Sequence, residues 1–179
     1  MGLDQYLICN SKIVCKEVNA EEPDREWKVS RGIAIQWRKA NAIHKWFVDN
    51  IQGGNDDCGT YEVSIEDLAR LHDICVEVLE STELVDAMVG RKLDEDGEWL
   101  PIKRKVKRLA DPTVAMELLP TRGGYCFGSQ EYGQWYWDDL TLTVESLDRL
   151  MENLVPIGWR VAHKDERDWF VKFYYESSW

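Results

Sequence analysis

The stretch that decides the expected fold is residues 31–52, Arg-Gly-Ile-Ala-Ile-Gln-Trp-Arg-Lys-Ala-Asn-Ala-Ile-His-Lys-Trp-Phe-Val-Asp-Asn-Ile-Gln. Six of its positions are spaced alternately by four and three residues, the spacing of one face of a helix. They are Ile33, Trp37, Ala40, His44, Phe47 and Ile51. The spacing predicts a central helix over 33–51, with Trp37, Phe47 and Ile51 largely buried.

One member of this face is a histidine, and Asn41 lies three residues before it. Buried polar side chains need hydrogen-bond partners. Two interpretations stay open from the residues alone. In the first, His44 and Asn41 bond neighbouring backbone and only fix the core. In the second, the helix forms one wall of a polar pocket.

Outside this stretch, strand patterns lie near both ends of the chain and helical patterns lie in the middle. The strands are expected at 2–9 and 11–18, joined as a hairpin through Asn10 and Ser11, from Trp27, and at 60–63, 98–109, 158–163 and 169–175. The helices are expected at 65–80, from Ser81 to about Val89, at 112–119, and from Asp139 or Thr143 to Leu154. This order predicts an α+β fold in which a small, mainly antiparallel sheet packs on three or four helices. We expect 1–179 to form a single domain with a variable insert at about 90–110.

Composition limits the classes of partner. The formal net charge is −11, which disfavours nucleic acid and anionic membranes as general partners. No apolar run approaches the roughly 20 residues of a membrane span, and the amino terminus does not read as a signal peptide. The five cysteines are odd in number and never spaced as Cys-x-x-Cys, so we expect reduced thiols in a cytoplasmic protein.

A basic cluster stands against this acidic background. Five of the six residues from Lys103 to Arg108 are Lys or Arg. Such clusters are usually a solvated edge or a match for an acidic body. The sequence does not fix the role of this one, nor does it fix the oligomeric state.

Three stretches together resemble an uncharacterised family of small phage and bacterial proteins, some of which carry the label phosphoglycerate kinase. They are Trp-Arg-Lys-Ala-Asn-Ala-Ile-His-Lys-Trp-Phe-Val (37–48), Asp-Asp-Cys-Gly-Thr-Tyr-Glu-Val-Ser (56–64) and Glu-Leu-Leu-Pro-Thr-Arg-Gly-Gly-Tyr-Cys-Phe-Gly-Ser-Gln-Glu-Tyr (117–132). The resemblance covers about the helical two-thirds of the chain and is lost around 90–108 and at the carboxyl end.

The resemblance implies a phage or prophage setting, hence the host cytoplasm if the protein is phage-encoded, and it implies no activity. The kinase label does not suit this chain. No Gly-x-x-x-x-Gly-Lys-Ser/Thr loop is present, and 179 residues cannot form the two-domain body of that enzyme.

The three stretches combine glycine, aromatic rings and hydrogen-bonding side chains, a mixture typical of pockets for small polar ligands. The candidate ligand-binding residues are Trp37, Arg38, Asn41, His44, Asp57, Tyr61, Ser129 and Tyr132. A guanidinium such as that of Arg38 suits phosphate or carboxylate, and the aromatic rings suit stacking on a base. In the competing interpretation, the rings fill the core and the glycines only make turns.

Two functions of different classes follow. The first is a non-enzymatic binding protein that captures a small polar, nucleotide-like ligand or a host protein, and so acts in counter-defence. The alternative is a small hydrolase or transferase that uses His44 with Asp57 or Cys58. No His-x-x-x-His or His-Glu-x-x-His spacing favours a metal site, and we expect no cofactor and no metal.

Overall fold

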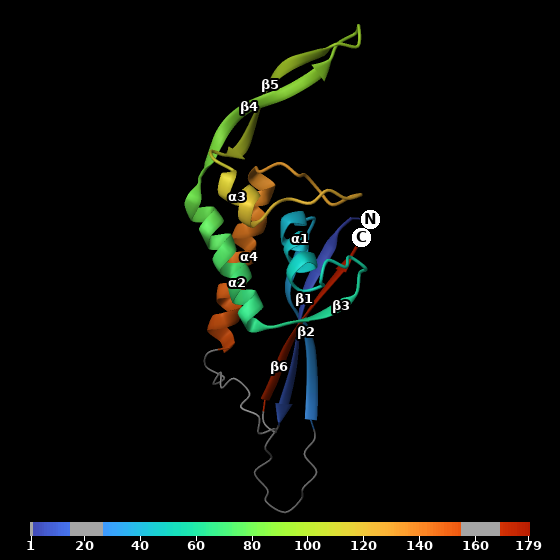
Figure 1. Cartoon of the computed structure of the whole chain (residues 1–179), viewed down its shortest axis with the longest axis vertical. Helices are drawn as coiled ribbons and strands as arrows, with labels where there is room; N and C mark the ends of the chain where they lie inside the picture. The colour runs from blue at the N-terminus through green and yellow to red at the C-terminus, as the bar shows by residue number, and fades with distance from the viewer. Residues whose placement is uncertain (1, 15–26, 155–168) are drawn as a thin grey trace, which may run out of the picture.

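An antiparallel four-stranded sheet, four helices and a long hairpin make up the part of the protein that the computed structural model describes, residues 2–14, 27–154 and 169–179 (Figure 1). The sheet has the order β2-β1-β6-β3, with β1 at Asp4–Val14, β2 at Trp27–Arg38, β3 at Thr60–Val63 and β6 at Trp169–Ser178. The helices are α1 (Asn41–Asn50), α2 (Ile65–Ser81), α3 (Thr113–Leu118) and α4 (Gln134–Leu154). The hairpin pairs β4 (Leu84–Leu93) with β5 (Trp99–Leu109). The predicted α+β class is confirmed.

Helix α1 joins the sheet to the α2–α4 helix pair. Phe47 of α1 stacks on Tyr175 of β6 with ring centroids 3.9 Å apart and an interplanar angle of 11°. Trp37 of β2 lies 5.9 Å from Phe47 and donates its indole N–H to Thr143 Oγ1 of α4 at 2.9 Å. All four side chains are essentially inaccessible to solvent. The aromatic cluster therefore connects sheet, α1 and α4 in one core.

The predicted helix over 33–51 is wrong for residues 33–40. Residues up to Arg38 belong to strand β2, and α1 begins only at Asn41. Ile35 and Trp37 are buried whereas Ile33 is 61% exposed, because the register with β1 shifts between the pairs Leu7–Ile35 and Ile8–Ile33, and this β-bulge turns Ile33 to the other face of the strand. The chain turns from strand to helix at Lys39, whose φ is 62°. Trp37 and Phe47 are buried as predicted, but Ile51 is only partly buried.

Two further element predictions are corrected. No hairpin forms at Asn10 and Ser11, because both continue the ladder of β1, opposite Arg31 and Ser30 of β2. No helix follows Ser81, whose hydroxyl donates to the carbonyl of Val78 at 2.8 Å and so bonds back into α2. Residues from Leu84 instead pair with β5, and helix α4 begins at Gln134, earlier than expected.

Several local signals are confirmed. Strand β3 covers 60–63, and Ser64 and Asp67 form a complete capping box at the start of α2. Helix α3 begins at Thr113 with Pro112, and not Asp111, as its N-cap residue, although Asp111 accepts the backbone N–H of Thr113 at 2.9 Å. The strand expected at 158–163 lies outside the described residues.

Four of the cysteines lie in the described part of the chain, and all four are free. Burial raises the pKa of the Cys75 thiol to about 12, so this side chain behaves as a small apolar group. Cys15 lies outside the described residues. No described helix is both long and apolar enough to cross a membrane.

Replacing Phe47 by Ala should lower the free energy of unfolding by about 3–5 kcal/mol, because it removes a ring stacked inside the core. Ile33→Ala provides the matched control, since Ile33 was expected on the same face yet is exposed. That variant should stay within about 0.5 kcal/mol of wild type. Urea denaturation measures both, and equal losses would contradict the assignment of Ile33 to a strand surface.

Candidate functional site

Asn41, the first residue of α1, holds a glycine-rich loop over residues 121–130, here called the 121–130 loop. Its amide nitrogen donates to the carbonyls of Ser129 at 2.7 Å and Phe127 at 3.3 Å, and its amide oxygen accepts the N–H of Arg122 at 3.1 Å. Asn41 is 4% exposed. A single buried amide therefore satisfies three backbone groups of a loop that lies 80 residues further along the chain, as buried polar groups require.

The loop packs closely because of its glycines. A Cβ on Gly128, whose φ is 97°, would lie 3.0 Å from the Cβ and carbonyl oxygen of Lys39. A Cβ on Gly124 would meet the ring of Phe127 at 2.5 Å. Glycine at 128 lets the loop lie directly against Lys39 and the start of α1, and glycine at 124 leaves room for the Phe127 ring within the loop.

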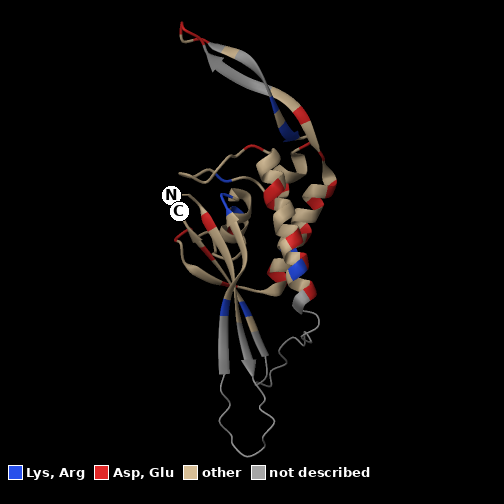
Figure 2. Cartoon of the chain, turned by 180° about the vertical axis from the view of Figure 1, so that it is seen from behind, with Lys and Arg blue, Asp and Glu red and all other residues tan. Residues whose placement is uncertain are grey.

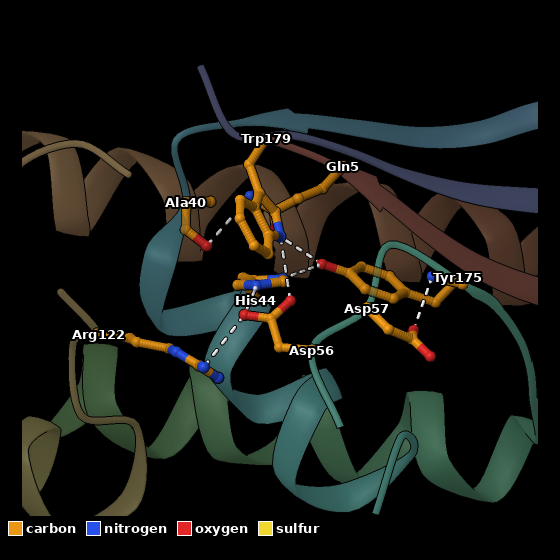
Figure 3. Close-up of polar contacts among 9 residues, drawn as sticks. Gln5, Ala40, His44, Asp56, Asp57, Arg122, Tyr175 and Trp179 are labelled. Atoms are coloured by element: carbon orange, nitrogen blue, oxygen red, sulfur yellow. Dashed lines mark hydrogen bonds and ion pairs between the residues drawn. The ribbon is translucent and has the colours of Figure 1, made fainter. Parts of the chain in front are cut away.

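His44 lies beneath this loop and is fully buried. Its Nδ1 lies 2.8 Å from the hydroxyl of Tyr175, and its Nε2 lies 3.2 Å from Asp56 Oδ2. The ring of Phe127 approaches it edge-on, with centroids 5.4 Å apart. Both ring nitrogens are thus engaged by protein groups (Figure 3).

Asp56 extends the contacts of His44 to the surface. The same Oδ2 lies 3.1 Å from a guanidinium nitrogen of Arg122, and Oδ1 accepts the indole N–H of Trp179 at 3.1 Å (Figure 3). The exposed fraction of the side chain rises from 0% for His44 to 11% for Asp56 and 32% for Arg122. The network therefore runs from the core to a solvent-accessible cation.

On the other side of His44, the network reaches strand β1. The hydroxyl of Tyr175 lies 3.2 Å from Gln5 Oε1, and Gln5 Nε2 donates to the carbonyl of Ala40 at 3.3 Å. The Tyr175 hydroxyl has one proton and faces two acceptors, Gln5 Oε1 and the unprotonated Nδ1 of a neutral His44. When His44 carries two protons, Nδ1 donates to Tyr175 and the hydroxyl is free to bond Gln5. Proton uptake by His44 thus changes the hydrogen bonding of the whole network.

Burial lowers the pKa of His44 below its ordinary 6.5, and the Arg122 guanidinium acts in the same direction, while Asp56 opposes them. At neutral pH the imidazole is therefore uncharged. The carboxylate of Asp56 only accepts hydrogen bonds, so the single ring proton lies on Nε2. Nδ1 then competes with Gln5 Oε1, 3.2 Å from the Tyr175 hydroxyl, for the single proton of that hydroxyl.

The predicted site residues fall into three groups. Asn41, His44 and the backbone of Ser129 lie together in this network. Trp37 instead lies in the core, and Arg38, on the other face of β2, is exposed and lies 3.8 Å from Asp4. The structure thus assigns Trp37 a packing partner and leaves Arg38 on an open strand surface.

Asp57 and Tyr61 form a local cluster of their own. The Tyr61 hydroxyl donates to the Asp57 carboxylate at 3.0 Å, and Asp57 also accepts from the Asn55 side chain and the Gly59 backbone. Tyr132 serves the 121–130 loop instead, because its hydroxyl accepts the N–H of Thr121 at 3.2 Å. Whether these residues contact a ligand stays a prediction.

The sequence-based site omitted most of the network. Asp56 and Arg122 are polar residues of the family-like stretches, but no sequence pattern distinguishes Asp56 from its neighbour Asp57, or Arg122 from Arg38. Gln5 lies in β1 and Tyr175 in β6, near the two ends of the chain, and Trp179 directly follows β6. Only the pairing of β1 with β6 brings them to His44, and no local pattern encodes it.

Within the described residues, no group of three or more His, Cys, Asp or Glu side chains could hold a metal ion. Cys58 is exposed, and the ring nitrogens of His44 face Tyr175 and Asp56 instead of its thiol.

Lowering the pH should destabilise the protein through His44. Because its pKa is lower in the folded protein than in the unfolded chain, the unfolded state binds more protons below pH 6.5. The stability is present above that pH and is lost as the pH falls, by at most about 1.4 kcal/mol per pH unit. Denaturation curves between pH 7.5 and 5 should show a smaller pH dependence for His44→Gln. His72→Gln, at a partly exposed histidine bonded to Asp148, is the control and should keep the wild-type slope.

A partly buried carboxyl on α4, that of Asp139, should change the stability with pH in the opposite direction. Burial, aided by the charge of Asp138, raises the pKa of Asp139 from its ordinary 3.8 to about 7. The folded protein therefore binds this proton more tightly, and stability falls as the pH rises from 4 to 7. Asp139→Asn should raise the free energy of unfolding at pH 8, by up to about 4 kcal/mol, with little change at pH 4. Glu145→Gln, at an exposed position of the same helix, should change neither value.

No protein-family model, curated protein or solved structure matches this chain.

Proposed function

We propose that this protein is a non-enzymatic binding protein that captures a small anionic, nucleotide-like ligand where Arg122, Asp56 and Trp179 meet. The observation that carries the proposal is the position of Arg122. Its partly exposed guanidinium is paired with Asp56, which Trp179 and His44 hold in place. A guanidinium fixed in this way is suited to a phosphate or carboxylate group.

Aromatic rings beside this cation support a nucleotide-like ligand. Trp179 is 51% exposed, and its other contact is an edge-to-face arrangement with Phe127 at 5.7 Å. Tyr125, in the 121–130 loop, is 90% exposed. Stacking of a base on such a ring contributes roughly 1–3 kcal/mol in single-strand binders.

The contacts of the two ring nitrogens of His44 favour a binding function over a catalytic one. A general base needs a ring nitrogen within reach of the substrate proton, but Nδ1 and Nε2 of His44 both face protein partners inside the core. We therefore assign His44 the role of orienting Asp56. Capture of a nucleotide signal in the cytoplasm of a phage-infected host would constitute counter-defence, and that setting rests on the sequence resemblance alone.

Calorimetric titration with nucleotides and cyclic dinucleotides tests the proposal. Wild type should bind at least one of them, and Arg122→Ala should bind it at least about tenfold more weakly, as expected when a charged hydrogen bond of 1.5–3 kcal/mol is lost. Arg38→Ala is the matched control, since Arg38 is an exposed arginine outside the network, and it should bind like wild type.

Two outcomes would contradict the proposal. Failure of wild type to bind any of these compounds would favour a host protein as the captured partner. Equal affinity of wild type and Arg122→Ala would remove the site from Arg122. Mass spectrometry of the ligand after denaturation separates the classes of function, because a binder returns it intact, whereas a hydrolase or transferase using His44 with Asp57 or Cys58 returns it altered.

A further inference from the structure

The β4–β5 hairpin, residues 84–109, projects from the body as an arm (Figures 1 and 2). It forms a two-stranded sheet of its own, paired from Leu84 and Leu109 at the root to Leu93 and Trp99 near the tip. At the root, Ala110 donates its N–H to the carbonyl of Glu83 at 2.9 Å, and Arg108 forms a single bridge to Gly133. The body thus anchors the arm only at its base.

The arm presents unpaired strand edges and exposed apolar side chains that could contact a second surface. A two-stranded hairpin without further packing is marginally stable in water, and unpaired strand edges invite pairing or cover. Met88 and Leu100 are 58% and 49% exposed. Contact with a second surface would bury these side chains.

The charge of β5 indicates what kind of surface fits. Strand β5 contains five Lys and Arg residues and no Asp or Glu. Lys105 and Lys107, whose side chains are 70% and 50% exposed, share one carboxylate, that of Asp86, at 2.7 and 3.6 Å. Two ammonium groups on one carboxylate leave positive charge near the root of the arm, so an acidic partner surface is favoured there, whereas the turn at the tip carries Asp94, Glu95, Asp96 and Glu98.

Such a surface exists on the same protein. Helices α2 and α4 each contain five acidic residues and one arginine, and Figure 2 shows acidic residues along both. The exposed ones are Glu66, Asp73, Glu77 and Glu80 on α2, and Asp138, Glu145, Asp148 and Glu152 on α4. This set is here called the acidic helix face.

The lengths and directions of the two surfaces also match. Strand β4 begins three residues after α2 ends, and the arm extends beyond that end of the helices (Figure 1). An 11-residue strand spans roughly 36 Å, whereas α2 and α4 span roughly 26 and 32 Å. A two-fold axis near the arm root would lay each arm along the helices of the other copy.

We propose that two copies of this protein exchange arms, each arm lying on the acidic helix face of the other copy. Lys105 and Lys107, close to the root of the arm, then meet Glu77 and Glu80, close to the end of α2 from which the arm departs. Both contacts are equivalent by symmetry, so the interface closes at two copies.

Sedimentation velocity and light scattering test the exchange over a range of protein and salt concentrations. Wild type should dimerise at 50 mM NaCl, and its dissociation constant should rise at least about tenfold at 500 mM, because exposed charge pairs are screened. An arm variant, D86K/K105E/K107E, reverses the sign of the cluster formed by these three side chains while keeping its cross-strand ion pairs. A helix variant, E77K/E80K, leaves the arm unchanged.

Each variant alone should be monomeric at concentrations where wild type is a dimer, since both of its contacts become repulsive. An equimolar mixture should form a heterodimer, because the acidic arm then meets the basic helix and the basic arm meets the acidic helix. Lys172→Glu, which alters an ion pair with Glu62 on the sheet, is the control and should dimerise like wild type.

Wild type that stays monomeric at low salt and high concentration would overturn the proposal, as would a mixture that forms no heterodimer while each variant keeps the wild-type melting temperature. A monomer that binds duplex DNA through the arm at physiological salt would assign the arm to nucleic acid instead.

Discussion

Tyr175 makes the contact on which the rest of the structure depends. Its ring stacks on Phe47, which places α1 against the sheet, and its hydroxyl lies between His44 and Gln5. A buried hydroxyl without partners would cost about as much as a lost hydrogen bond, so the positions of β6, α1 and β1 are tied to one side chain. Stacking provides the affinity between these elements, and the hydroxyl fixes their orientation.

The class of the fold followed from the order of strand and helix patterns, whereas element boundaries did not. The segment from Ile33 to Phe47 fits a helical stripe, yet its first part is a strand, because pairing with β1 is available there and the turn at Lys39 separates the two parts. Single-element spacing cannot decide between a stripe and an alternation over six residues. Strand β4 could not be predicted from its own spacing either, because what makes it a strand is pairing with β5, which lies across a turn.

Site residues could be predicted from the sequence only where they lie close together in one segment. Asn41 and His44 could be singled out because both lie on a helix face that also carries apolar residues. Their partners come from both ends of the chain and from two loops. The choice between Asp56 and Asp57 is decided by backbone direction in a turn, where Asp57 bonds the nearby Tyr61 and Gly59. The backbone directions in this turn depend on tertiary contacts, and those contacts cannot be read from the sequence before the fold is known.

The strand order β2-β1-β6-β3 has a consequence for how the molecule folds. Strand β6 lies between β1 and β3, so the sheet closes only through pairing of residues about 165 positions apart, such as Leu7 with Tyr175. Loop closure over that distance is slow relative to local helix formation. Because β6 follows α1, α2 and α4 in the chain, the edge of β1 that it covers stays unpaired until β6 is made, and an unpaired edge invites association with other chains. The acidic net charge reduces this hazard, since like-charged chains repel each other before the last strand arrives.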